Sequence, residues 1–287
     1  MLSHLIPEKS AFLAGLKALG KVFAIPMMED SMRNLSKIVL SSFILVTSLL
    51  FFPLPHHAQE ERAREIVKKV DELYRADTSE ALVEMEIVTP HWQRTLKMRV
   101  WSQGMDKTFI RILEPKKERG VATLRIGNEM WNFLPKTNKV MKIPPSMMMS
   151  SWMGSDFTND DLVKEFTFLE SYDFEIFSID NPKEGELYIT CTPKKGLPIV
   201  WGYIIVAVKE EDYIPLWQKF HDEKGKLMRE MIFKDIKTFG DRKIPSVLEL
   251  TPKTKEGHKT VLKYLEARFD IPLDDETFTL RNLRKGI

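Results

Sequence analysis

The sequence predicts a mainly β protein of the α+β class, in which a curved antiparallel sheet forms an incomplete β-barrel with lid helices. Apolar residues recur at helical spacing over residues 60–74, and from residue 81 onward the period changes to two. No Gly/Ser-rich linker interrupts residues 81–271, so the candidate strands are assigned to one domain. A sheet of more than about ten strands has to curl, close or split, and an incomplete barrel closed by helices meets that requirement.

The first half of the domain begins with the helix over residues 60–74, which carries apolar side chains on one face and charged side chains on the other. Six candidate strands follow, at residues 81–89, 93–102, 107–114, 120–127, 129–134 and 138–143. In the second of these strands, Leu96, Met98 and Val100 alternate with polar residues. This alternation is typical of antiparallel strands with one buried face.

The alternating pattern stops at Pro144 and Pro145, and residues 146–157 have no clear period. Thr158 is a typical N-cap residue, which predicts a short helix directly after it with aspartates in its first turn. Seven more candidate strands follow, at residues 173–179, 186–192, 203–210, 213–221, 226–236, 244–251 and 260–269. The tail, residues 274–283, is predicted to be a short helix or turn that docks back onto the sheet.

The N-terminal part has the order of an export signal. A basic start is followed by the uncharged apolar run at residues 38–52, then by prolines and by Ala58. We interpret residues 32–58 as a signal peptide and residues 59–287 as a single exported domain. The run holds 15 residues, fewer than the roughly 20 that span a bilayer as a helix, although an uncleaved inner-membrane anchor is the alternative. Residues 1–31 are interpreted as a spurious or extended leader.

Charge and cysteine content exclude several classes of protein. The chain has 43 Lys+Arg and 41 Asp+Glu, a formal net charge of +2, which argues against a nucleic-acid partner. Its single cysteine, Cys191, excludes an intramolecular disulfide framework and is expected to be a buried small apolar residue. The domain is therefore expected to rely on its apolar core for stability, without cofactor or metal.

Sequence signatures of enzymes are missing. After residue 58 the histidines are His91, His221 and His258, and none belongs to a metal-ligand pair at helical spacing. The sequence has no G-x-S-x-G elbow and no P-loop. We therefore predict a protein without catalytic residues. The enzymatic alternative is a hydrolase that uses one of three aspartates, namely Asp156, Asp160 and Asp161.

A methionine- and tryptophan-rich stretch is the strongest indication of a ligand. Methionine is flexible and polarizable, so a methionine-rich surface can adapt to apolar partners of variable shape, such as acyl chains. Aromatic residues on an inward face of the curved sheet would extend such a surface. The predicted cavity or lid residues are Trp101, Phe109, Trp131, Phe133, Met147, Met148, Met149, Trp152 and Met153. Ordinary core packing is the competing interpretation of the same residues.

Four runs of residues resemble one family of exported proteins. They are RILEP at 111–115, RGVATLRIG at 119–127, MWNFLPKTNKVMKIPPSMM at 130–148 and SSWMGSDFTNDDLVK at 150–164. The last run is the most specific. With these runs the chain resembles the LolA-like family of outer-membrane lipoprotein-sorting proteins, and the resemblance extends more loosely over nearly all of residues 59–287.

The resemblance implies a half-open, LolA/LolB-like β-barrel with lid helices over a hydrophobic cavity for acyl chains. It also implies a monomeric periplasmic carrier, loaded by an inner-membrane transporter, that moves lipids or lipoproteins between the inner and outer membranes. The alternative function is a lipid-sensing or accessory interaction module for a membrane regulator or exporter.

Overall fold

The computed structural model describes residues 56–74, 76–164 and 168–285, which belong to one compact unit, Pro55–Ile287. The predicted leader at residues 1–31 lies outside the described residues. So does the predicted signal peptide at residues 32–58, apart from its last three residues, which begin the first described helix.

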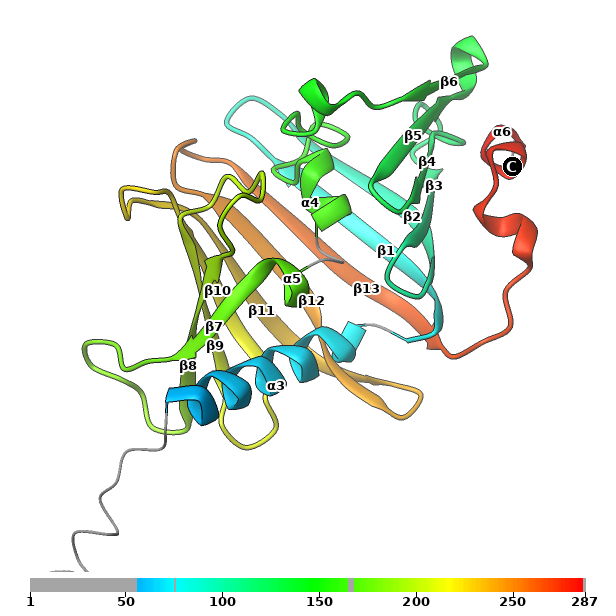
Figure 1. Cartoon of the computed structure of the whole chain (residues 1–287). Helices are drawn as coiled ribbons and strands as arrows, with labels where there is room; N and C mark the ends of the chain where they lie inside the picture. The colour runs from blue at the N-terminus through cyan, green and yellow to red at the C-terminus, as the bar shows by residue number, and fades with distance from the viewer. Residues whose placement is uncertain (1–55, 75, 165–167, 286–287) are drawn as a thin grey trace, which may run out of the picture. The chain divides into compact units, whose positions relative to one another are not determined.

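Thirteen strands, one helix of 19 residues and several short helices make up the described part of the chain (Figure 1). The strands are β1 (Thr78–Val88), β2 (Gln93–Gln103), β3 (Lys107–Glu114), β4 (Ala122–Ile126), β5 (Glu129–Leu134), β6 (Lys139–Lys142), β7 (Tyr172–Ile176), β8 (Glu186–Pro193), β9 (Tyr203–Lys209), β10 (Pro215–His221), β11 (Leu227–Phe239), β12 (Arg242–Pro252) and β13 (Lys259–Phe269). The helices are α3 (His56–Tyr74), α4 (Asn159–Lys164), α5 (Phe168–Ser171) and α6 (Leu280–Arg284), with 3-10 turns η1 (Pro135–Thr137), η2 (Pro145–Met147) and η4 (Asp275–Phe278).

All thirteen strands lie in one antiparallel sheet, in the order β6-β5-β4-β3-β2-β1-β13-β12-β11-β10-β9-β8-β7. The sheet is thus two meanders, β1–β6 and β7–β13, that are joined where the first strand pairs with the last. The edge strands are β6 and β7, and the sheet does not close into a barrel. The predicted fold class and every predicted strand are confirmed.

The chain between the two edge strands crosses one face of the sheet. We call residues 143–171, which contain η2, α4 and α5, the crossover segment. Because β6 and β7 lie at opposite edges, this segment has to pass over the strands between them. Figure 1 shows α3, α4 and α5 on the same side of the curved sheet, which we call the inner face. The C-terminal α6 lies beyond β3 and β4, on the outer face.

Two apolar clusters cover much of the inner face. The helix-side cluster packs α3, through Ile66 and Val67, against buried residues of β7–β10 such as Val206. The crossover-side cluster packs Trp152 of the crossover segment against β1, β2 and β3, where Met85 is fully buried. Each covering element therefore protects its own part of the same sheet face.

A third cluster lies on the outer face. There Phe109 and Phe133 pack against Phe278 and Leu283 of the C-terminal tail. The predicted docking of the tail is confirmed. Arg111, 7% exposed, holds this tail by donating to the carbonyl oxygen of Asn282 at 2.7 Å and to that of Lys285. A cation at this position also interacts favourably with the negative end of the helix dipole.

Replacing Arg111 is expected to release the tail. Arg111→Met removes two charge-assisted hydrogen bonds, and we expect a loss of about 2 kcal/mol in the free energy of unfolding. Urea denaturation measures this loss, and faster tryptic cleavage at Arg281 or Arg284 reports the release. The control is Arg119→Met, because Arg119 is exposed and donates to the carbonyl of Leu113 at the end of β3, away from the tail. Equal protection of the tail in both variants would contradict this role for Arg111.

Candidate functional site

A row of apolar side chains crosses the inner face of the sheet at its centre. Strand register places Met85 opposite Leu262, Leu262 opposite Leu248, and Leu248 opposite Phe233. Directly paired residues point to the same face, so the row runs over β1, β13, β12 and β11. Four strands at about 4.8 Å spacing give it a length of roughly 14 Å.

Burial along this row is uneven. Met85 is fully buried, whereas Leu262, Leu248 and Phe233 are only half-buried. Leu262 packs against the edge of the crossover-side cluster, while Leu248 and Phe233 belong to neither inner cluster. The seam between the two covering elements is therefore apolar and incompletely covered by the described residues. We call these four side chains the apolar row.

Side chains of the crossover segment fix it to the inner face at three points. The Trp152 indole Nε1 donates to Thr123 Oγ1 on β4 at 3.2 Å. Asp156 and Thr260 of β13 form two hydrogen bonds, one from the Asp156 amide at 3.0 Å and one to its carboxylate at 2.8 Å. The third point is an ion pair with β11. The three anchors lie on three different strands, and this spacing stretches the segment across the sheet.

The ion pair joins Arg229 on β11 to Asp161 on α4. It is bidentate, with N–O distances of 2.7 and 2.8 Å, and the two side chains are 9% and 17% exposed. The Arg229 guanidinium also lies over the rings of Trp201 and Phe220, 4.5 and 4.2 Å from their centroids. The planar guanidinium is therefore paired with a carboxylate along one edge and stacked near two aromatic rings, a setting that suits arginine better than lysine.

The carboxylate of this pair also orders the start of α4. Asp161 accepts hydrogen bonds from the amide and hydroxyl of Thr158, and its own amide donates to Thr158 Oγ1 at 3.1 Å. This reciprocal capping confirms the predicted N-cap. Burial by itself would raise the pKa of Asp161, but Arg229 and the Thr158 bonds outweigh burial and hold that pKa below its ordinary value.

A tight turn aims Trp152 at the sheet. Met153 and Gly154 both have positive φ, 52° and 75°, and the Ser155 amide donates to the Trp152 carbonyl at 2.9 Å. Glycine suits the second position because a Cβ there would lie 3.2 Å from Nη2 of Arg94. The same arginine donates to the Met153 carbonyl. The turn is therefore held from β2 as well as from within the crossover segment.

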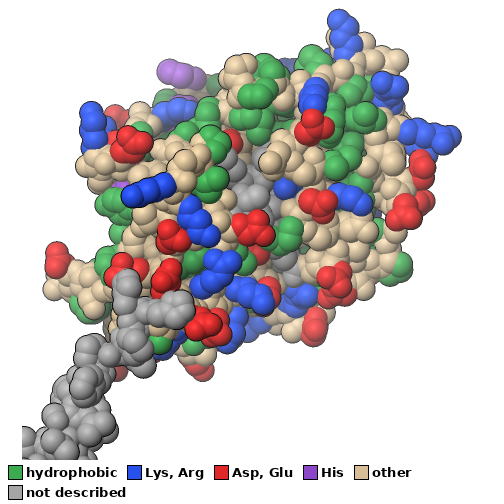
Figure 2. Space-filling view, in the orientation of Figure 1, with side chains coloured by type: hydrophobic (Ala, Val, Ile, Leu, Met, Phe, Trp, Pro, Cys, Tyr) green, Lys and Arg blue, Asp and Glu red, His purple; other side chains and the backbone are tan. Residues whose placement is uncertain are grey.

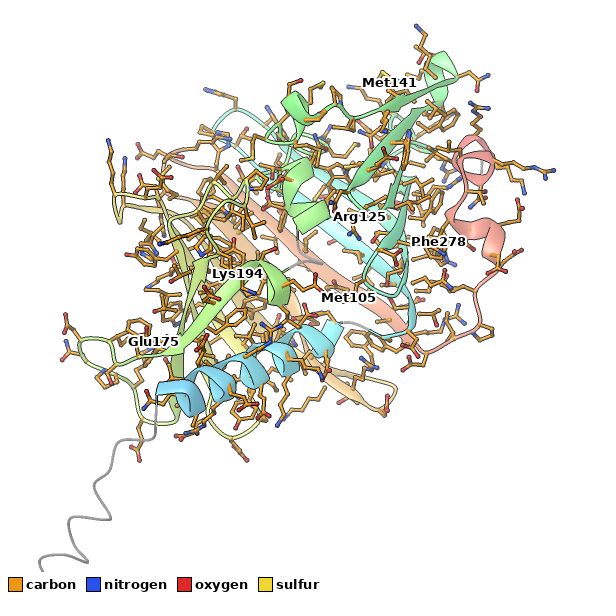
Figure 3. All side chains as sticks on the ribbon, in the orientation of Figure 1. Met105, Arg125, Met141, Glu175, Lys194 and Phe278 are labelled. Atoms are coloured by element: carbon orange, nitrogen blue, oxygen red, sulfur yellow. The ribbon has the colours of Figure 1, made fainter. Side chains whose placement is uncertain are left out.

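An open recess of about 780 Å³ lies at one end of the inner face. It is bordered by the C-terminal part of α3, by Met105 in the β2–β3 turn, by Leu169 of α5 and by the β11–β12 turn. Its apolar side chains are Leu73, Ala76, Met105 and Leu169, among charged side chains of both signs. Figure 3 shows Met105 and Arg125 on the inner side of the sheet, and Arg125 donates to the Met105 carbonyl.

The sequence-predicted site residues fall into three groups. Met148, Trp152 and Met153 lie in or against the crossover-side cluster on the inner face, with Trp152 buried. Met147 and Met149 belong to the same stretch but point to solvent, each 48% exposed. The structure therefore brings three of the five crossover residues to the inner face.

The four aromatic candidates lie on the outer face. Trp101 pairs with Phe109 across β2 and β3, and both join the outer cluster together with Trp131 and Phe133. Figure 3 shows Arg125 and Phe278 on opposite sides of β3 and β4, which separates this cluster from the inner face. One cavity cannot be lined by both groups, so we assign the aromatic group to packing beneath the C-terminal tail.

Sequence reasoning missed Arg229 and the apolar row. Arg229 alternates with Met231 and Phe233 on one side of β11, and an arginine on an otherwise apolar strand face needs a buried partner. That pattern is the signal that would have found it. Asp156 and Asp161, considered above as catalytic groups, have their carboxylates bonded to Thr260 and Arg229 and serve as anchors.

Other types of site find little support in the described part of the chain. Cys191 is fully buried in the helix-side cluster, as predicted, and burial strongly raises the pKa of its thiol. Between residues 56 and 285, leaving out the gaps, no three His, Cys, Asp or Glu side chains are grouped as metal ligands would be. Within the same residues, none of the helices has the length and apolar character needed to cross a membrane.

Comparison with known proteins identifies the fold and the family. A family model described as "Uncharacterized protein" matches residues 104–285, more than half of the chain. A LolA superfamily protein from Nitrosomonas europaea has a TM-score of 0.64 at 21% identity, covering 77% of this chain and 98% of its own. The chain therefore belongs to the family of that model and has a LolA-like fold. No curated protein sequence matches it significantly.

Two further structures have the same LolA-like fold. A DUF1329 family protein from Desulfovibrio piger has a TM-score of 0.71 at 20% identity, with 78% of this chain and 99% of that chain covered. A putative outer membrane lipoprotein-sorting protein domain from Vibrio parahaemolyticus has a TM-score of 0.68 at 23% identity, with 79% and 100% covered. The unclosed sheet with covering helices is thus the LolA-like architecture over nearly the full length of these neighbours.

Proposed function

We propose that this LolA-like protein is a periplasmic carrier that binds the acyl chains of lipids or lipoproteins between the crossover segment and the apolar row. The observation that carries the proposal is the seam itself, where Leu262, Leu248 and Phe233 stay half-buried between two covering elements. Single half-buried apolar side chains are common, but a contiguous row of them in a groove is typical of a ligand-binding surface. An apolar guest would complete their burial.

Burial of an acyl chain can supply the binding free energy without a catalysed reaction. Each buried methylene contributes about 0.8 kcal/mol, so an acyl chain of ~14 carbons gains roughly 10 kcal/mol before the costs of binding. No catalytic group is needed for such a guest to bind or leave. The recess near Met105 offers an end of the inner face where a polar head group can stay in contact with water.

Release follows from competition for the same surface. The crossover segment covers part of the inner face with Trp152 and Met148, and the guest covers the neighbouring part. A conformation in which the segment packs closer over the apolar row would favour the empty protein. The anchors at Thr123, Thr260 and Arg229 define where that segment can bend and where it is held.

The decisive experiment is recovery of the guest. Protein purified from the periplasm of its native host is extracted with organic solvent, and the extract is analysed by mass spectrometry. We expect lipids or acyl chains in near-stoichiometric amount, and saturable uptake of a fluorescent fatty acid by the emptied protein. Protein that is repeatedly recovered empty and takes up no probe would refute the carrier function.

A further inference from the structure

An exposed apolar surface lies on the outside of the crossover segment. Met147 and Met149 are each 48% exposed, Met141 of β6 is 44% exposed, and Trp92 of the β1–β2 turn is 45% exposed. Arg94 links Trp92 to the crossover segment, because its guanidinium lies 5.4 Å from the Trp92 ring centroid and donates to the Met153 carbonyl. Figure 2 shows hydrophobic side chains gathered at this end, over η2 and β5–β6, and Figure 3 places Met141 there. We call these four side chains the docking patch.

The methionines of the docking patch are held in place. Asn159, which is buried, donates from its side chain to the Met147 carbonyl at 3.0 Å and from its amide to the Ser150 carbonyl at 3.0 Å. The Asp160 amide donates to the Met148 carbonyl at 2.8 Å. The backbone around η2 is thus ordered by α4 while Met147 and Met149 stay in water. Ordered exposure of large apolar side chains is typical of surfaces that meet a partner.

The charge around the methionines of the docking patch is mainly positive. Residues 130–155 contain no Asp or Glu, and they contain three lysines, Lys136, Lys139 and Lys142, all exposed. Glu129, at the start of β5, pairs with Lys142, so the surface keeps a net positive charge. A surface of tryptophan, methionine and lysine complements an anionic lipid interface, because the apolar groups enter the acyl boundary and the lysines meet the head groups.

We propose that the docking patch binds the surface of an anionic lipid bilayer. A bilayer suits this surface better than a folded partner does, because the recess described above lies at the other end of the strands. The patch also combines flexible methionine side chains with exposed lysines. This proposal rests on the proposed carrier function, because docking would bring the carrier to the membrane that supplies or receives its lipid. The crossover segment would thus touch the membrane through Met147 and Met149. Through Met148 and Trp152 it packs on the crossover-side cluster, which adjoins the apolar row.

Contact is measured locally, in the full chain, so that other apolar segments do not confuse the result. Met147→Cys is labelled with an environment-sensitive dye, and the native Cys191 stays unlabelled because it is fully buried. Vesicles of phosphatidylcholine and phosphatidylglycerol at 7:3 are expected to raise and blue-shift the emission. Pure phosphatidylcholine vesicles are expected to have a much smaller effect, and about 0.5 M salt is expected to weaken the response.

The matched control is Ile236→Cys, because Ile236 is 38% exposed on β11, near the β11–β12 turn and far from β6 in the sheet order. Its dye is expected to be unchanged by either vesicle. In the Met147→Cys background, changing Lys136, Lys139 and Lys142 to glutamate is expected to weaken vesicle binding by at least about 100-fold, since each lysine contributes about fivefold. A dye at residue 147 that ignores anionic vesicles, or responds equally to neutral ones, overturns the proposal.

Two further outcomes separate the docking proposal from the carrier proposal. A dye response at residue 147 that depends on protein concentration without vesicles would assign the patch to a second copy of the chain and overturn membrane docking. Uptake of the fluorescent fatty acid is measured on the same variants. The triple glutamate variant is expected to keep this uptake, whereas a protein that docks to vesicles but takes up no probe would refute the carrier function alone.

Discussion

Arg229→Met is expected to free the crossover segment from the sheet. The substitution leaves the Asp161 carboxylate buried without its cation, and breaking such a pair costs about 3 kcal/mol or more. The crossover segment lies on the surface of the sheet, so the lost stability is expected to appear first as local opening of this segment. Amide hydrogen exchange over residues 158–164 is expected to accelerate by about 100-fold, and a bound acyl probe is expected to exchange faster. Exchange rates measured by mass spectrometry report the first effect.

Charge pairing is separated from packing by a double variant. Asp161→Asn keeps an oxygen for the Thr158 amide but leaves Arg229 without its counterion. Arg229→Met combined with Asp161→Asn removes both charges, so its loss is expected to be well below the sum of the two single losses. Glu170→Gln, on the exposed side of α5, is the neutral control. Additive losses in the double variant would contradict a buried ion pair.

The ion pair also gives the opening a pH dependence. The pKa of Asp161 is lower in the folded protein than in the unfolded chain, where it is about 3.9. Its contribution to stability is therefore complete above pH ~4 and is lost as pH falls through the folded value. The crossover segment of the wild type is expected to open at acid pH, and the Asp161→Asn protein is expected to lack that part of the transition.

Leu248→Glu is expected to abolish acyl-chain binding. Leu248 lies at the middle of the apolar row, half-buried and outside both inner clusters. A carboxylate there would have to be desolvated by the guest without a cation to pair with, which costs several kcal/mol. We expect the fluorescent fatty acid to bind at least about 100-fold more weakly. Titration of the emptied protein with the probe measures this change.

Two control variants test whether the weaker binding of Leu248→Glu comes from its position in the apolar row. Leu265→Glu places the same charge on β13 at a residue that is 41% exposed, and it is expected to bind the probe normally. Leu248→Ala shortens the side chain without a charge and is expected to weaken binding only severalfold. Equal binding by Leu248→Glu and Leu265→Glu, with both proteins folded, would move the guest site away from the apolar row.

Much of the fold could be predicted because its signals are local. The period-two patterns and turn residues located every strand, and Thr158 marked the start of α4 correctly. Boundaries differed where packing continues an element beyond its pattern. α3 begins at His56 instead of residue 60, and β11 extends to Phe239. The helix α5 had no periodic signal, because it is four residues long.

The candidate site was only partly predictable, because alternation does not say which face of a strand points inward. Trp101 and Phe109 share a face, and the pattern alone allows that face to be the inner or the outer one. Only the pairing of β1 with β13 and the path of residues 143–171 settle it. The same long-range pairing creates the apolar row, whose members Met85 and Phe233 are distant in sequence.

The pairing of β1 with β13 has a consequence for assembly. Strand β1 can pair with its second neighbour, β13, only when the last strand has been added. Every other pair of neighbouring strands is consecutive in the chain. A chain that stops before residue 259 keeps two half-sheets, each with a long unpaired border that invites pairing with another molecule. The sheet is therefore complete only when β13 has paired with β1. Truncation that removes β13 is expected to produce aggregates instead of a smaller functional domain.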